Sequence, residues 1–465
     1  MPARFEEIDR DTPLILPPNL RDWVPAGHLA HFILDAVDEL DLSRCKVNHR
    51  GTGSKQMPPA MMMALIVYSY ATGVFGSRRI EQSTHDSVPV RMICADTHPD
   101  HDTICTFRRE NGPVVQAAFV RVLQLAQELK LLKVGGITTA IDGTKVMANA
   151  SKHSAVSYQH AGKSIEQLDL EVKQLLAKAE QSDTTPLEDG LSIPNEICRR
   201  QERKAKLAQA RAEIEARAAA RAAAQMAEYQ AKLHEHEARK DRGDKVGPGP
   251  KPPSGDAQPG DQHNFTDPES RIMKAGNGQH FEQAYNAQAA VDVDSRLIVG
   301  NRVSQAPNDK KELVATVESI PSQVGRPETV LTDSGFYSQQ AVKQIEQTPE
   351  GQPSGTTVYA AMDKKDHHRN VADLEKKDEP QAPPPGADMR DIMRQRLRTK
   401  QGKAKYKLRQ QTVEPVFGII KSAMGFRQFL LRGLKKVSLE WELICLAYNL
   451  KRLHIIGAAQ KLAKV

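Results

Sequence analysis

The sequence predicts an α/β protein in which a mixed five-stranded sheet with flanking helices follows an all-helical N-terminal domain. Three observations lead to this fold class. Residues 1–130 carry apolar side chains at helical spacing, and residues 131–163 and 261–375 alternate short apolar runs with helical segments. Residues 164–242, between them, are rich in Ala, Glu, Lys and Arg, which favour helix. The sheet is therefore expected to carry a long helical insertion after its first strand.

The N-terminal domain is expected to be a compact helical bundle. Helical spacing covers residues 30–42 and 107–132, and a further helix begins at Pro58 and Pro59. We predict that exposed arginines of this bundle bind DNA ends, and a plain helical domain with a polar face is the alternative. The candidate DNA contacts are Arg78, Arg79, Arg108 and Arg109.

The cysteines predict reduced thiols, because five of them are scattered along the chain. A zinc site made of Cys94, His98, His101 and Cys105 is conceivable, but the paired-cysteine spacing typical of zinc sites is absent. A helical segment with incidental histidines is the favoured interpretation.

The insertion is expected to be a helical hairpin or arm. Its apolar residues include two pairs seven apart in different phases, so a sustained coiled coil is not predicted. Residues 243–260 are rich in Gly and Pro and are predicted to be disordered, which places the arm and its loop at residues 164–260. A second, Pro-rich linker covers residues 376–388 and precedes the basic C-terminal helices of residues 389–465.

The order of the core elements predicts how the sheet is assembled. The chain gives three strands, helix, strand, helix, strand and helix, which is the order of an RNase H-like fold. The expected strands are residues 137–141, 284–293, 297–305, 329–332 and 357–362, the expected helices are residues 310–320 and 338–347, and a last helix opens at Glu414.

Three acids are expected to meet in this fold. Asp142 and Asp333 follow the first and fourth strands, which are neighbours in such a sheet. Glu414 is expected in the first turn of the last helix, where Thr412 can cap and Pro415 is tolerated. Carboxylates are the ligands that Mg²⁺ prefers, and two ions roughly 4 Å apart can assist attack at a phosphate. The three acids therefore predict a two-metal site for cutting and joining nucleic acid.

The charge distribution also favours nucleic acid as the partner. The net charge is +7, yet residues 389–465 hold eighteen Lys and Arg side chains against four Asp and Glu. Such a concentration is typical of a phosphate-binding surface, although a solvated basic face is the alternative. Lys421 lies two helical turns after Glu414, with Phe417 and Gly418 expected between them on the same face.

Length and hydropathy limit the class of protein. A chain of 465 residues suggests about three units at roughly 150 residues each. The longest apolar run, residues 57–70, is too short to cross a bilayer, and residues 1–10 lack a signal-peptide core. We therefore expect a cytoplasmic protein.

Four motifs give the sequence a family resemblance. Residues 141–146 (IDGTKV), 331–337 (LTDSGFY) and 413–421 (VEPVFGIIK) resemble the three acid-bearing motifs of DDE transposases from bacterial insertion sequences. Residues 285–292 (YNAQAAVD) resemble the second-strand motif of that group, and the N-terminal region resembles its helical domain. The resemblance implies that Asp142, Asp333 and Glu414 are catalytic metal ligands for two Mg²⁺ ions, for which Mn²⁺ can substitute.

The resemblance also implies DNA contacts around the glutamate. The family signature is Tyr, two residues, Arg, three residues, Glu, six residues and Lys. It is matched by Tyr406, Arg409 and Lys421, together with Glu414. The one difference is that four residues, and not three, separate Arg409 from Glu414. The expected activity is that of a transposase which binds the terminal inverted repeats of its element and target DNA, working as a dimer. Two alternatives stay open: an RNase H-like nuclease or resolvase that cuts without joining, and an inactive DNA-binding relic.

Overall fold

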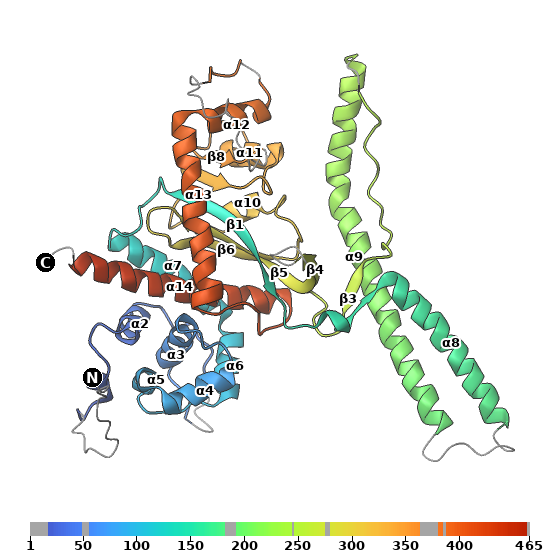
Figure 1. Cartoon of the computed structure of the whole chain (residues 1–465), viewed down its shortest axis with the longest axis horizontal. Coiled ribbons are helices and arrows are strands. Elements are labelled where there is room, and N and C mark those ends of the chain that lie inside the picture. Colours follow the sequence, from blue (N-terminus) through green and yellow to red (C-terminus); the bar gives the residue numbers. More distant parts are fainter. Residues whose placement is uncertain are drawn as a thin grey trace, which may run out of the picture. The chain divides into compact units, whose positions relative to one another are not determined.

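A computed structural model of the chain describes residues 17–48, 55–181, 192–243, 246–274, 280–362, 380–384 and 387–462 (Figure 1). The chain divides into two compact units, each taken by itself below. The first combines Met1–Val146 with Tyr285–Val465, and the second is Met147–Ala284. No helix among the described residues is long and apolar enough to cross a membrane.

The N-terminal part of the first unit is helical, as predicted. Its centre is α3, in which every residue from Met62 to Ala71 is buried. The C-terminal helix α14 (Leu434–Leu462) packs against α2, α3 and α7, so the two ends of the chain share one apolar core. The N-terminal helices are α1 (Leu20–Trp23), α2 (Leu29–Asp38), α3 (Pro59–Ala71), α4 (Ser77–Asp86), α5 (Val88–Ile93), α6 (His101–Glu110) and α7 (Gly112–Glu128).

The predicted mixed sheet is present, in the order β4-β5-β1-β7-β8 with β6 paired to β5. β1 runs parallel to β7, and β7 parallel to β8, while β5 and β6 form the expected antiparallel hairpin. The short strand β4 is additional to the five expected and pairs with the start of β5. The strands are β1 (Thr138–Met147), β4 (Arg271–Lys274), β5 (Phe281–Asp292), β6 (Ile298–Ser304), β7 (Thr329–Thr332) and β8 (Thr357–Ala360).

The register of β1 and β7 sets the positions of two acids. Ala140 lies opposite Leu331 in the parallel ladder. One step of two residues leads from each partner to Asp142 and Asp333, and side chains two residues apart point to the same face of a strand. The two carboxylates are therefore at the same level of neighbouring strands.

Helices flank this sheet in the expected order. α10 (Leu313–Glu318) and α11 (Gln339–Glu346) alternate with the strands, and α12 (Met389–Arg398) leads into α13 (Lys400–Gly418). α12 packs on β8 and α13 on β7, so the basic C-terminal segment lies beside the strand that Asp333 follows.

The helix that carries Glu414 begins earlier than predicted. It starts at Lys400, where the Thr399 hydroxyl accepts a hydrogen bond from the Gly402 amide at 3.0 Å. Glu414 is consequently near the C-terminal end, and Pro415 lies inside the helix and not at its start. A π-helical turn, Ile419–Ala423, follows directly. The prediction was wrong because the proline was taken as a start signal, whereas the preceding run of helix-favouring Lys, Gln, Ala and Leu residues extends the helix upstream.

The second unit contains the predicted helical arm. α8 (Tyr158–Gln181) and α9 (Ile193–Asp241) pack together through a small apolar cluster. Next to it, the short strands β2 (Ala155–Ser157) and β3 (Gln262–Asn264) pair in antiparallel fashion. The buried members of the cluster are Val156, Ala161, Leu168, Leu207 and Ala210.

The Gly/Pro-rich segment after α9 contains no helix or strand at residues 246–261. Residues 246–261 follow an extended path back along α9, as Figure 1 shows. His236 Nε2 lies 2.8 Å from the Gly247 carbonyl oxygen, and Arg221 forms an ion pair with Asp261 at 3.2 Å. Contacts to a long exposed helix thus hold a segment whose composition alone indicates disorder. Most of the predicted linker at residues 376–388 is described, apart from residues 376–379 and 385–386.

Candidate active site

Arg409 links Asp142 to Glu414, and Asp333 lies near Asp142. Asp142 lies within β1, Asp333 follows β7, and Glu414 is on α13. Arg409 Nη1 is 3.2 Å from Asp142 Oδ2, and its Nη2 is 4.0 Å from Glu414 Oε1. Asp333 interacts electrostatically with Asp142. Elements distant in the sequence thus place three acids and one arginine in one neighbourhood.

Asp142 is more buried than Glu414, with 20% of its side chain exposed against 58% for Glu414. Burial raises the pKa of Asp142 to about 6, and the charges of Asp333 and Asp309 act in the same direction. The positive charge of Arg409 and a hydrogen bond from the Gly143 amide to Asp142 Oδ1, at 2.8 Å, oppose this rise. The ionised form of the Asp142 side chain therefore lowers the stability of the folded protein.

This loss of stability predicts that Asp142→Asn stabilises the metal-free protein at neutral pH. The folded-state pKa of about 6 is above the ordinary value of 3.8, so stability falls as pH rises through this window. A difference of about 2 in pKa corresponds to about 3 kcal/mol, which sets the upper limit of the gain at about pH 7, whereas below about pH 4 the gain disappears. Denaturant unfolding in EDTA across this pH range measures it.

Asp102→Asn is the matched control, because its carboxylate is 88% exposed. It should follow the wild-type pH dependence. An Asp142→Asn curve that runs parallel to the wild-type curve at every pH would contradict the assignment of a strained, ionised Asp142.

Asp333 is held by its own turn. Its Oδ1 accepts a hydrogen bond from the Gly335 amide at 2.8 Å, and the Phe336 ring is fully buried. The buried phenylalanine anchors the loop after β7, so that the carboxylate stays at the end of the strand. This explains why the acid and the aromatic residue occur together in the segment 331–337.

A polar network beneath Gly143 was missed in the sequence. Asp309 Oδ1 accepts hydrogen bonds from Asn286 Nδ2 at 2.6 Å and from Gln288 Nε2 at 2.7 Å, and Lys145 Nζ lies 3.6 Å away. A Cβ atom on Gly143 would come within 2.3 Å of Gln288 Nε2 and 2.6 Å of Asp309 Oδ1, so a larger residue there would displace these side chains. The alternation of Asn286 and Gln288 on β5 was a usable signal, whereas Asp309 lies in a loop without any pattern.

Lys421 reaches back to β1 from the π-helical turn. Its Nζ donates a hydrogen bond to the Lys145 carbonyl oxygen at 2.9 Å. Burial lowers the pKa of Lys421, and the charges of Arg427 and Lys145 lower it further. Cations gathered in this way favour an anionic ligand.

Three other C-terminal residues differ in their surroundings. Phe417 is not on the face of Glu414 as predicted, because its ring is 8% exposed and lies 6.4 Å from the Trp441 ring. Tyr406 is close to the acids: burial raises its pKa, Arg409 lowers it, and the charge of Asp333 raises it again. Gly418 is exposed, with open space where a Cβ would lie.

The four N-terminal arginines divide into two groups. Arg78, Arg79 and Arg109 are exposed on α4 and α6. Arg108 is only 4% exposed and donates hydrogen bonds to the Tyr70 hydroxyl and the Phe75 carbonyl, both at 2.9 Å. Its hydrogen-bond donors point into the protein, so Arg108 is not part of the proposed DNA-binding surface.

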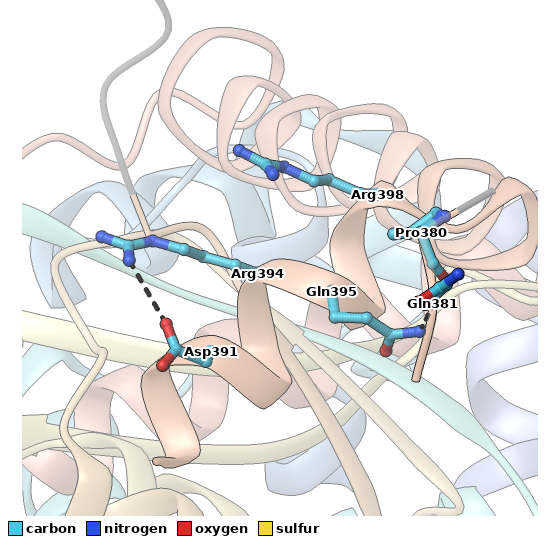
Figure 2. Close-up of a pocket in the computed structure, with 6 residues that line it drawn as sticks. All are labelled: Pro380, Gln381, Asp391, Arg394, Gln395 and Arg398. Carbon is cyan, nitrogen blue, oxygen red and sulfur yellow. Dashed lines mark hydrogen bonds and ion pairs between the residues drawn. The ribbon is translucent and has the colours of Figure 1, made fainter. Parts of the chain in front are cut away.

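A polar hollow on α12 is separate in its residues from the acids (Figure 2). Arg394 Nη1 lies 3.5 Å from Asp391 Oδ1, and Gln395 Nε2 donates to the Pro380 carbonyl oxygen at 3.5 Å. The hollow is lined by Pro380, Gln381, Asp391, Arg394, Gln395 and Arg398. It belongs to the basic C-terminal segment and not to the acid cluster.

The acids fit divalent metal ions in their chemistry. Carboxylate oxygens are hard donors of the kind that Mg²⁺ and Mn²⁺ take. The Arg409 guanidinium lies between Asp142 and Glu414 as a cation that neutralises both. Within the described ranges, however, no three His, Cys, Asp or Glu side chains are close enough together to hold a metal, in this cluster or around Cys94 and His98. The carboxylate oxygens are suitable metal ligands, but the described side chains do not converge on a single metal position.

Comparison with known proteins identifies both ends of the chain. Residues 18–110 match the model of a transposase domain (DUF772), and residues 380–454 match the model of a transposase DDE domain. No curated protein and no solved structure matches the chain. The first match covers the N-terminal helices from α1 to α6, and the second contains Arg409, Glu414 and Lys421. The chain therefore carries an N-terminal transposase domain and a transposase DDE domain.

Proposed function

We propose that this protein is the transposase of a bacterial insertion sequence, which binds the terminal inverted repeats of its element and catalyses metal-dependent DNA cleavage and strand transfer. One observation carries the proposal. Asp142 and Asp333 extend from neighbouring parallel strands, and Glu414 approaches them on α13, joined to Asp142 through Arg409. The two transposase domains supply the class of reaction.

The catalytic roles follow from the positions of the side chains. Asp142 and Asp333 would hold divalent ions between them, and Glu414 would complete the set. When bound, two such ions assist the attacking oxygen and stabilise the leaving oxygen in a displacement at phosphorus. The protein itself orients the DNA. Gly418 leaves space for a sugar-phosphate backbone, and Lys421 would bind a phosphate beside Asp142.

The DNA contacts divide between the two ends of the chain. Arg78, Arg79 and Arg109 are exposed on the N-terminal helices and would bind the element ends. The basic C-terminal segment would hold flanking or target DNA, with Tyr406 and Arg409 next to the acids. Because both ends of an element must be handled together, a homodimer in the DNA complex is expected.

The proposal is tested with DNA that flanks the gene. Matched inverted repeats there would be joined to a labelled duplex and incubated with the purified full chain and Mg²⁺ or Mn²⁺. We expect cuts at the repeat ends, followed by covalent joining of the 3′ ends to an added target duplex. A scrambled repeat of equal length is the matched control.

Three other outcomes would contradict all or part of the proposed function. Cutting of branched DNA without joining would support the nuclease or resolvase alternative and contradict the transposase proposal. Specific repeat binding without cutting, with either metal, would indicate an inactive relic. Equal cutting of repeat and scrambled DNA would remove the proposed role of the N-terminal helices.

A further inference from the structure

Arg409 is placed within the acid cluster in an unusual way. Its side chain is 11% exposed, and its two terminal nitrogens face Asp142, at 3.2 Å, and Glu414, at 4.0 Å. Its Nε is buried without a hydrogen-bond partner among the described residues. Arg409 thus has its charge directed at two acids from two different elements, while part of its hydrogen-bonding capacity is unused.

The neighbourhood of Arg409 is rich in negative charge. Asp142 interacts electrostatically with the negative charges of both Asp333 and Asp309. Lys145 is paired with Asp309 at 3.6 Å and interacts with the charge of Asp142 only from farther away, and Lys421 donates to a backbone carbonyl. The ion pair of Asp142 is formed with Arg409. Buried carboxylates that repel one another need a nearby cation. Arg409 supplies that charge to Asp142.

The atoms that Arg409 faces are carboxylate oxygens, the kind of ligand that a divalent ion takes. A metal ion bound by Asp142 and Glu414 takes carboxylate oxygens as ligands, and Arg409 already engages Asp142 Oδ2 and approaches Glu414 Oε1. Two cations cannot both neutralise these acids at close range without repelling each other. The guanidinium and the metal therefore compete.

We propose that Arg409 is a substitute cation that holds the acid cluster in its metal-free form and is displaced from Asp142 when divalent metal binds. The released guanidinium is then available to a DNA phosphate, for which its planar donors are well suited. This inference rests on the proposed function, because it takes Asp142 and Glu414 as metal ligands. Arg409 acts here through the carboxylates and is a positioning residue.

Binding of Mn²⁺ to the DNA-free full chain tests this inference. The electron paramagnetic resonance signal of free Mn²⁺ measures how much of the ion is bound. Arg409→Gln is expected to bind Mn²⁺ roughly tenfold more tightly than the wild type, because removing a close cation changes the affinity of a carboxylate for a competing cation by at least this factor. Arg394→Gln is the control for net charge, since Arg394 lies on α12 and pairs with Asp391, which is not one of the three acids. It should bind Mn²⁺ like the wild type.

Unchanged or weaker Mn²⁺ binding by Arg409→Gln would overturn the inference, and so would equal tightening in Arg394→Gln. If Arg409→Gln does not fold, Arg409→Met decides the matter. Methionine keeps part of the aliphatic stem and removes the charge, so this variant should also bind Mn²⁺ more tightly than the wild type, and equal affinity counts against the inference.

Asp142→Asn separates this failure from failure of the proposed function. If Asp142→Asn leaves Mn²⁺ binding intact, the metal site itself is misassigned. If Asp142→Asn abolishes binding while Arg409→Gln does not strengthen it, the metal site stands and only the competition is refuted.

Discussion

Asp333→Asn is expected to reduce DNA cleavage and strand transfer by at least roughly a thousandfold, because a divalent ion supplies several kcal/mol of charge stabilisation and each 1.36 kcal/mol is worth a factor of ten. The substitution keeps the shape of the side chain and the acceptor for the Gly335 amide, so the loop after β7 should stay in place. Initial rates of cutting and joining, measured separately on repeat-bearing DNA, give the result. Binding of the repeats should change little.

The matched control for this loss is Glu318→Gln, which neutralises an exposed acid at the end of α10, outside the cluster. It should keep wild-type rates. Asp142→Asn and Glu414→Gln should resemble Asp333→Asn, and a double variant should be hardly slower than a single one, since residues that act as a unit are not additive. Rates within tenfold of the wild type for Asp333→Asn would refute its place in the site.

Glu440→Ala is expected to destabilise the protein by about 3–5 kcal/mol, the usual result of removing one partner from a buried charged network. Glu440 is fully buried on α14, and its Oε2 accepts hydrogen bonds from the Leu430 and Leu431 amides, both at 2.9 Å. Its Oε1 lies 3.5 Å from the Tyr70 hydroxyl, which in turn accepts from Arg108. The alanine variant leaves two backbone donors and a buried arginine uncompensated.

Denaturant unfolding at neutral pH measures this loss, and hydrogen exchange locates it. Amides of α3 and α6 should lose protection together with α14, because the network connects all three helices. Glu440→Gln is the matched variant. It keeps the volume and one acceptor, so a smaller loss is expected. Equal losses in the two variants would show that the negative charge of Glu440 contributes nothing.

The positions of Asp142 and Asp333 on neighbouring strands and the sheet order could be predicted because local patterns mark them. Asp142 and Asp333 follow apolar runs that bury as parallel strands, and the order of strands and helices then fixes which strands are neighbours. The start of α13 could not be predicted in the same way. Pro415 is a strong local signal, but the long upstream run and its packing on β7 decide where the helix begins.

Residues that look alike in the sequence can differ in how deeply they are buried. Arg108 and Arg109 are adjacent, yet the first is buried beside Tyr70 and the second is exposed, because neighbouring positions on a helix point in different directions. Phe417 likewise packs near Trp441, which lies 24 residues later in the chain on another helix, and this contact has no local signature.

The sequence by itself determined the order of the elements, the basic C-terminal segment and the three acids, since each depends on residue type and spacing along the chain. Only the tertiary structure decided that Arg409 lies between Asp142 and Glu414, that Asp309 supports Gly143, and that Arg108 faces inward. These features depend on side chains that meet across large sequence separations. Their pairing is selected by desolvation and charge in the folded chain, and neither is visible before the elements pack.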